Sequence, residues 1–160
     1  MSRLKISVWA GMVVFAVFLA GCTNLPSIQE QAKNKLQNRA SMIFDMVADE
    51  LLAPVPLTAD QLKNYGKNSQ IFYNSSVDNR GNAIIFAFID ADAESGGGFW
   101  YESWKAKSCL KINYILMQHS REVNMESVSC PSGGLQGMKA DEEVVIPKMV
   151  RLLSESSSSS

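Results

Sequence analysis

The chain has few of the residues that most often carry catalysis or bind nucleic acid. Its 160 residues include one histidine and three cysteines, and its formal net charge is only −1. It contains no GxSxG, HExxH or phosphate-binding glycine-rich motif. It also lacks a basic run of the kind that binds nucleic acid or anionic lipid. We therefore expect neither a motif-bearing enzyme nor a nucleic-acid-binding protein.

The remaining candidates for chemistry are weak. His119 lies beside Ser120 in an expected turn, a place that rarely holds a general base in a fixed orientation. The three carboxylates of residues 90–94 suggest calcium, but Ser95 stands where an EF-hand loop needs Gly and Tyr101 where it needs a bidentate Glu. We expect these acids to form a solvated strand end that discourages edge-to-edge pairing. The sequence thus predicts no metal and no cofactor.

The first 22 residues are organised as an export signal. Arg3 and Lys5 precede an apolar run over residues 6–20, which is shorter than the roughly 20 residues of a membrane-spanning helix. The segment Leu19-Ala20-Gly21-Cys22 then resembles the lipobox of bacterial lipoproteins. That resemblance implies diacylation of the Cys22 thiol and cleavage before it. Residues 1–21 are then a signal peptide and residues 22–26 a lipidated tether, whereas the alternative is an ordinary secretory signal with a chance cysteine.

The resemblance also implies a destination. In lipoproteins, Asp after the lipidated cysteine favours the inner membrane of Gram-negative cells, and this chain has Thr23 there. We therefore expect the periplasmic face of the outer membrane, or the cell surface if the host is Gram-positive. Removing the signal takes Arg3 and Lys5 from the 15 basic residues and leaves 13 against 16 acidic ones, a net charge of −3. Residues 27–153 are expected to form one domain, and residues 154–160 a disordered serine-rich tail.

The mature sequence predicts an α+β domain, in which an N-terminal helix packs on a mostly antiparallel sheet. Ser27 and Glu30 form a capping-box pattern, and the helix must end before Pro54. Its polar first half is expected to project toward the membrane and its apolar second half to pack on the core. Thr58 and Gln61 repeat the capping pattern for a short second helix.

After the second expected helix, the spacing of the apolar residues changes from that of helices to that of strands. Residues 71–75 and 83–89 predict two strands joined by a turn at 78–81, and residues 95–98 a glycine-rich break. The aromatic segment 99–108 can be either a strand or a helix, and the spacing of Trp100 and Trp104 favours the helix. Residues 110–118 and 122–130 alternate and predict a hairpin that turns at 119–121. Residues 144–153 predict a last short element interrupted at Pro147.

Two cysteines remain besides Cys22. An even pair in an exported protein most often forms a disulfide, so Cys109 and Cys130 are expected to be bonded and to fasten the open end of the hairpin. Their spacing is too long for a CxxC redox pair, and no second pair completes a zinc site.

The densest aromatic group suggests an interaction surface. It consists of Phe99, Trp100, Tyr101 and Trp104. Aromatic side chains next to a glycine run commonly anchor a protein interface, so these four residues are the predicted partner-binding group. The alternative is that they fill the core.

The expected parts follow one another as a lipidated cysteine, an early helix, an apolar strand, an aromatic segment that ends in a cysteine, and a strand hairpin closed by a second cysteine. This order resembles that of secretion pilotins, which are outer-membrane lipoproteins that bind a segment of a secretin subunit. This resemblance covers residues 27–130 and predicts an apolar groove between helix and sheet. The expected function is therefore that of a non-enzymatic, lipid-anchored protein that binds a protein partner in the envelope. One alternative is an inhibitor or immunity lipoprotein that uses the loop 132–137 against a hydrolase. Another is a small hydrolase in which Glu102 and Glu122 converge.

Overall fold

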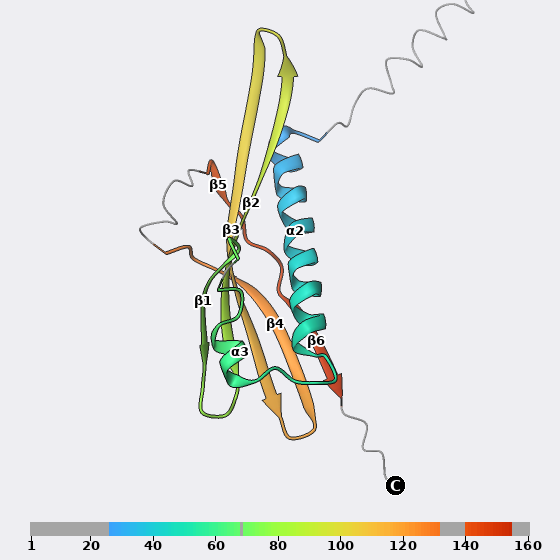
Figure 1. The fold of residues 1–160 in the computed structure, drawn as a ribbon. Helices are drawn as coiled ribbons and strands as arrows, with labels where there is room; N and C mark the ends of the chain where they lie inside the picture. Colours follow the sequence, from blue (N-terminus) through green and yellow to red (C-terminus); the bar gives the residue numbers. More distant parts are fainter. Residues whose placement is uncertain (1–25, 68, 132–139, 155–160) are drawn as a thin grey trace, which may run out of the picture.

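The computed structural model describes residues 26–67, 69–131 and 140–154 (Figure 1). The helices are α2 (Ile28–Leu51) and α3 (Ala59–Lys63), and the strands are β1 (Phe72–Val77), β2 (Ala83–Gly97), β3 (Trp100–Met117), β4 (Ser120–Val128), β5 (Glu142–Glu143) and β6 (Met149–Ser154). The sheet has the order β1-β2-β3-β4-β6, and β5 pairs with β3 outside this path. Only the β3–β5 pair is parallel. The expected α+β fold, with one long helix on a mostly antiparallel sheet, is confirmed.

Both predicted N-cap residues are in place, and the second of them forms a complete capping box. The Ser27 hydroxyl accepts a hydrogen bond from the backbone N–H of Glu30 at 3.2 Å, which satisfies one of the free donors at the start of α2. The Thr58 cap is a complete capping box, because Gln61 answers with a side-chain bond to the Thr58 backbone at 2.8 Å. α2 ends at Leu51, before Pro54, as expected.

The expectation that the first half of α2 projects away from the core is wrong. Ala32 and Leu36, in the first half of α2, and Ala40 at its midpoint have no exposed surface, so the first half also packs on the core, although more residues of the second half are buried. Small residues at two of these positions let the helix lie close to the sheet. The polar residues that suggested projection occupy the opposite side of an amphipathic helix.

The core lies between α2 and one face of the sheet. Its centre is built from alternate residues of the long strands, with the other face left partly solvated. The fully buried members from β2, β3 and β4 include Ile85, Ile89, Leu110, Ile112, Val123 and Met125. The helix–sheet interface is therefore filled by the chain's own side chains, where the pilotin resemblance predicted an apolar groove.

The aromatic segment is a strand, so of the two structures that the sequence allowed for residues 99–108, the one that the tryptophan spacing favoured is wrong. β3 runs without interruption from Trp100, and every residue of β2 from Ala83 to Gly97 pairs with it. The chain does break at the end of the glycine run, because β2 ends at Gly97, but the acids of residues 90–94 lie inside β2 rather than at its end. Cross-strand pairing over this length outweighs the weak helical spacing of the two tryptophans.

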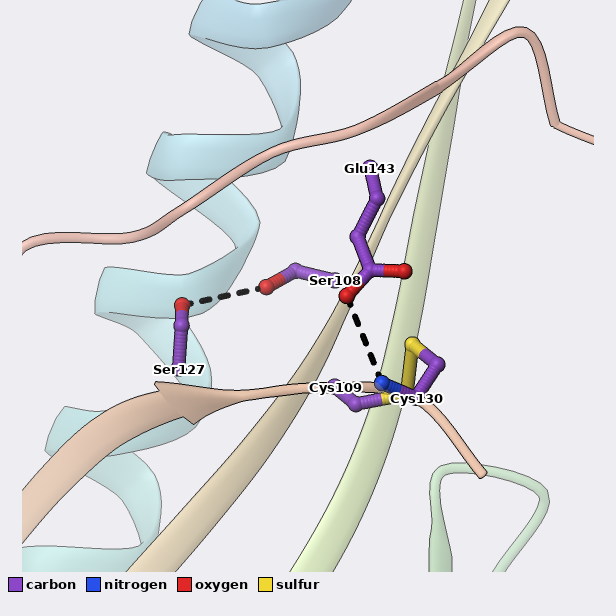
Figure 2. The surroundings of a disulfide bond; sticks show 5 residues. All are labelled: Ser108, Cys109, Ser127, Cys130 and Glu143. Atoms are coloured by element: carbon purple, nitrogen blue, oxygen red, sulfur yellow. Dashed lines mark hydrogen bonds between the residues drawn. A yellow bond between two sulfur atoms is a disulfide. The ribbon is translucent and has the colours of Figure 1, made fainter. Parts of the chain in front are cut away.

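The hairpin of β3 and β4 was predicted, and its disulfide is formed. The turn lies at residues 118–119, slightly earlier than expected. Cys109 and Cys130 are bonded with their Cα atoms 5.2 Å apart, where β4 ends (Figure 2). Around the bridge, the backbone N–H of Cys130 donates to Glu143 at 3.3 Å, and the hydroxyls of Ser108 and Ser127 lie 3.2 Å apart. These bonds fix the point where the chain leaves β4.

The last part of the chain returns across the core. After β5 it crosses the sheet on the side of α2, buries Val144 and Ile146, and reaches the edge as β6. Pro147 lies between β5 and β6, so the predicted interruption is correct, although residues 144–148 are not a strand. The predicted loop 132–137 lies outside the described residues. Of the predicted tail 154–160, Ser154 is the last residue of β6, and residues 155–160 lie outside the described residues.

Candidate functional site

The β2–β3 hairpin carries the most exposed aromatic residues of the described chain. Beyond Asp90 its two strands leave β1 and β4 behind, and past the short pairing of β3 with β5 they extend beyond the start of α2 as a two-stranded ribbon (Figure 1). Its end exposes Phe99 completely, Trp100 to 84% and Tyr101 to 62%. We call these three residues the hairpin tip. Apolar surface of this kind is costly in water and usually marks a contact with another molecule.

Two glycines allow the tight turn that exposes the tip. Gly97 and Trp100 are the last paired residues, so the loop consists of Gly98 and Phe99 alone. Gly98 has a φ of 71°, and a two-residue hairpin loop with such a glycine in first position matches the turns that fit strand twist. Gly96 has a φ of 98°, and a Cβ there would collide with the carbonyl oxygen of Trp100. The glycine run is therefore part of the hairpin.

Trp104 lies apart from the other three aromatic residues. It is partly buried against the core and pairs across the ribbon with Ala93, which is 1% exposed. The predicted group of four is thus divided between two environments, and core filling describes Trp104. Sequence reasoning missed this division because it required the register of β3.

The base of the ribbon is fixed to α2 by two cations. Lys35 Nζ donates to the main-chain oxygen of Asp92 at 3.0 Å. Arg39 Nη1 donates to the main-chain oxygen of Asp90 at 2.8 Å and lies 3.2 Å from its carboxylate. These contacts hold the ribbon beside the first half of the helix, so its tip and the N-terminal end of α2 point the same way.

A third attachment lies on the other strand of the ribbon. The Glu142 carboxylate accepts hydrogen bonds from Gln29 and Lys33, both at 2.8 Å, and β5 pairs Glu142 with Ala106. The bonds from Lys33 and Gln29 hold the pKa of Glu142 below its usual value. The indole of Trp104 lowers this pKa less than Lys33 and Gln29 do.

The carboxylates of the ribbon are matched by lysines. Asp90 stands opposite Lys107 and Asp92 opposite Lys105, so each pair of charges projects from the same face. Beyond them, Tyr101 donates to Glu94, and this hydrogen bond raises the pKa of the tyrosine. Within the described residues, no three carboxylate, histidine or cysteine side chains are grouped to hold a metal ion.

The residues considered for catalysis do not meet. His119 is exposed in the turn between β3 and β4. Glu102 pairs with Ser95 near the tip, whereas Glu122 pairs with Ile115. At about 3.3 Å per residue, these two positions are about 40 Å apart along β3. Glu102 and Glu122 therefore cannot act on one substrate in this fold.

A second exposed apolar group lies at the other end of the molecule. β6 is the last strand of the sheet, and no strand in the described part of the chain pairs with its outer edge. Its Val150 and Leu152 are 55% and 53% exposed. We call this strand edge and its two side chains the β6 edge. The sequence predicted an element here, but only the strand order identifies it as an open edge.

Searches for a known relative returned none. Comparisons with protein-family models, with curated proteins and with solved structures gave no match. Among the helices of the described residues, none is both long and apolar enough to cross a membrane.

Proposed function

We propose that this chain is a lipid-anchored, non-enzymatic envelope protein that binds a protein partner. The acyl chains on Cys22 would hold the domain at the periplasmic face of the outer membrane, or on the cell surface of a Gram-positive host. Tethering raises the local concentration of the binding domain without adding a contact to the partner. Such a protein would serve as an assembly or targeting factor, as pilotins do.

The anchor is supported by the sequence from Leu19 to Cys22 and by the short segment that follows it. Only five residues separate Cys22 from Ile28, the first residue of α2. A tether of this length keeps the folded domain close to the membrane. The end of the domain that carries the ribbon would then face the lipid, and the end that carries β6 would face away from it (Figure 1).

The β6 edge is the observation that carries the protein-binding proposal. An unpaired strand edge offers a row of main-chain donors and acceptors that an extended peptide can match. Val150 and Leu152 project from the same face and supply apolar contacts beside that edge. β6 contains one charged residue, Arg151, which is engaged with Asp49 on α2. The edge therefore lacks the charges that usually prevent strand addition.

Photo-crosslinking in intact cells tests this assignment. The full chain would carry a benzophenone amino acid at Leu152, or at Ser76 on the opposite edge strand β1 as the matched control. We expect one discrete crosslinked protein from position 152 and none from position 76. Equal labelling from both positions, or no adduct from position 152, would remove the β6 edge as the binding surface.

An inhibitor or immunity lipoprotein is the second candidate, and the projecting ribbon favours it. A narrow hairpin with exposed aromatic residues has a shape that enters the cleft of a hydrolase. The same crosslinker at Phe99 separates the two functions. A hydrolase crosslinked from position 99 would support inhibition, whereas a secretion or assembly component crosslinked from position 152 supports the first proposal.

A further inference from the structure

We propose that the hairpin tip inserts into the interfacial region of the membrane that holds Cys22. Phe99, Trp100 and Tyr101 would form a second, non-covalent attachment beside the lipid anchor. This inference rests on the proposed anchoring at Cys22 and adds to it a membrane contact for the hairpin tip.

The direction of the ribbon is the first argument. Lys35 and Arg39 hold it against the first half of α2, so the tip extends beyond the helix at its N-terminal end (Figure 1). From Asp92, opposite Lys35, the strand continues for six residues to Gly98, or about 20 Å. The helix from Lys35 back to Ile28 covers only about 10 Å. The tip therefore lies roughly 10 Å beyond the start of α2.

The length of the tether is the second argument. Six peptide steps lead from Cys22 to Ile28, and an extended chain of that length spans at most about 20 Å. This reach exceeds the overhang of the tip. Acyl chains on Cys22 and the tip can thus contact one membrane plane together, and a shorter tether would press the tip into it.

The chemistry of the tip is the third argument. Trp and Tyr concentrate at the level of lipid headgroups, where a ring can bury its apolar part and keep its polar group wet. Phe99, at the apex, is the residue that would enter deepest. Because the loop contains only Gly98 and Phe99, few main-chain groups would have to leave water.

The charges near the tip determine which lipids it prefers. Asp92, Glu94 and Glu102 are acidic, and no lysine or arginine occurs from residue 91 to residue 104. Attraction to anionic headgroups therefore contributes nothing, and the contact depends on the aromatic rings. We expect insertion to be stronger in zwitterionic than in anionic vesicles, the opposite of a polybasic anchor.

Tryptophan fluorescence tests the inference directly. After removal of residues 1–21, Trp100 and Trp104 are the only tryptophans. The lipidated Trp104→Phe protein, reconstituted in phosphatidylcholine vesicles, leaves Trp100 as the single reporter. We expect a blue shift of its emission and quenching by lipids brominated near the headgroup, with both effects reduced in phosphatidylglycerol vesicles. If Trp104→Phe folds poorly, the difference in emission and quenching between wild-type protein and Trp100→Phe reports on Trp100 instead.

Matched variants and flotation complete the design. Phe99→Ser in the Trp104→Phe background should lose most of the quenching, whereas Val150→Ser at the remote β6 edge should keep it. Protein that floats with vesicles while Trp100 stays unquenched would overturn the inference and leave the anchor intact. Protein that carries no lipid on Cys22 and does not float would overturn the proposed anchoring instead. A Trp100 blue shift that appears only with added envelope protein would assign the tip to a protein partner and refute insertion.

Discussion

The Lys35 ammonium group donates a hydrogen bond to the main-chain oxygen of Asp92 at 3.0 Å, across 57 positions of sequence. With Arg39 and Asp90, one turn further along α2, it fixes a solvent-exposed ribbon to a helix whose apolar face packs on the core. These contacts set the direction of the tip. Their contribution to global stability is small, because all four residues are accessible to water.

Replacing both cations should therefore loosen the ribbon and leave the fold intact. In Lys35→Ala/Arg39→Ala, we expect faster hydrogen exchange at amides of residues 92–104 and an unfolding free energy within about 1 kcal/mol of wild type. Exchange measured by mass spectrometry, with β4 amides as the internal control, gives the comparison. Unchanged exchange in the ribbon would show that these two contacts do not hold it.

The two tryptophans should respond differently to truncation. Trp104 packs against the core opposite Ala93, so Trp104→Ala should destabilise the fold by about 2 kcal/mol. Trp100 is 84% exposed, and Trp100→Ala should stay within about 0.5 kcal/mol of wild type. Urea unfolding followed by circular dichroism measures both variants. Equal losses would mean that the tip packs against the domain.

The Cys109–Cys130 bond closes a loop with a sequence separation of 21. In the chain-entropy model, a loop of this size stabilises the fold by about 3 kcal/mol. Cys109→Ser/Cys130→Ser should lose about that amount in urea unfolding. Wild-type protein under reducing conditions should fall to the level of the double variant, and a reductant-insensitive wild type would contradict a formed disulfide.

Acid should weaken the attachment of β5 to α2. The pKa of Glu142 is lowered from its ordinary value of 4.5 by Lys33 and Gln29, so its carboxylate stabilises the native state above that value. The contribution disappears as the pH falls through the lowered pKa. We therefore expect Glu142→Gln to be less stable than wild type at pH 7, with a difference that shrinks below pH 4.5.

Thermal unfolding between pH 3 and pH 7 measures this difference. Asp78 also has a lowered pKa, because the Asn82 side chain and backbone donate to it. The Glu142→Gln variant should therefore still lose some stability between pH 7 and pH 3, and this remaining loss should be smaller in Glu142→Gln/Asp78→Asn. A gap between wild type and Glu142→Gln that stays constant with pH would mean that Glu142 does not titrate below its ordinary value.

Local patterns predicted much of this fold. The hydroxyls of Ser27 and Thr58 cap helices because their spacing to the next donors is fixed by the chain itself. The alternation from Leu110 to Tyr114 predicted a half-buried strand, and Cys109 and Cys130 flank its hairpin. In each case the residues that predict the feature and the residues that form it are close in sequence, a few positions apart or within one hairpin.

Features that depend on distant partners were missed. Asp90 and Asp92 suggested a strand end, but a ribbon solvated on one face tolerates them when lysines stand opposite. Trp100 and Trp104 share a helical spacing, yet they lie in one strand paired over fifteen positions. The exposure of the β6 edge follows from strand order, which no local pattern contains.

Intact mass spectrometry of the protein purified from membranes, beside a Cys22→Ala variant, tests the anchor on which the proposed function depends. We predict a wild-type chain that begins at Cys22 and carries acyl groups, and a Cys22→Ala chain that keeps its signal and carries none. A wild-type protein that is recovered without acyl groups, or that is cleaved at another residue, would contradict anchoring at Cys22.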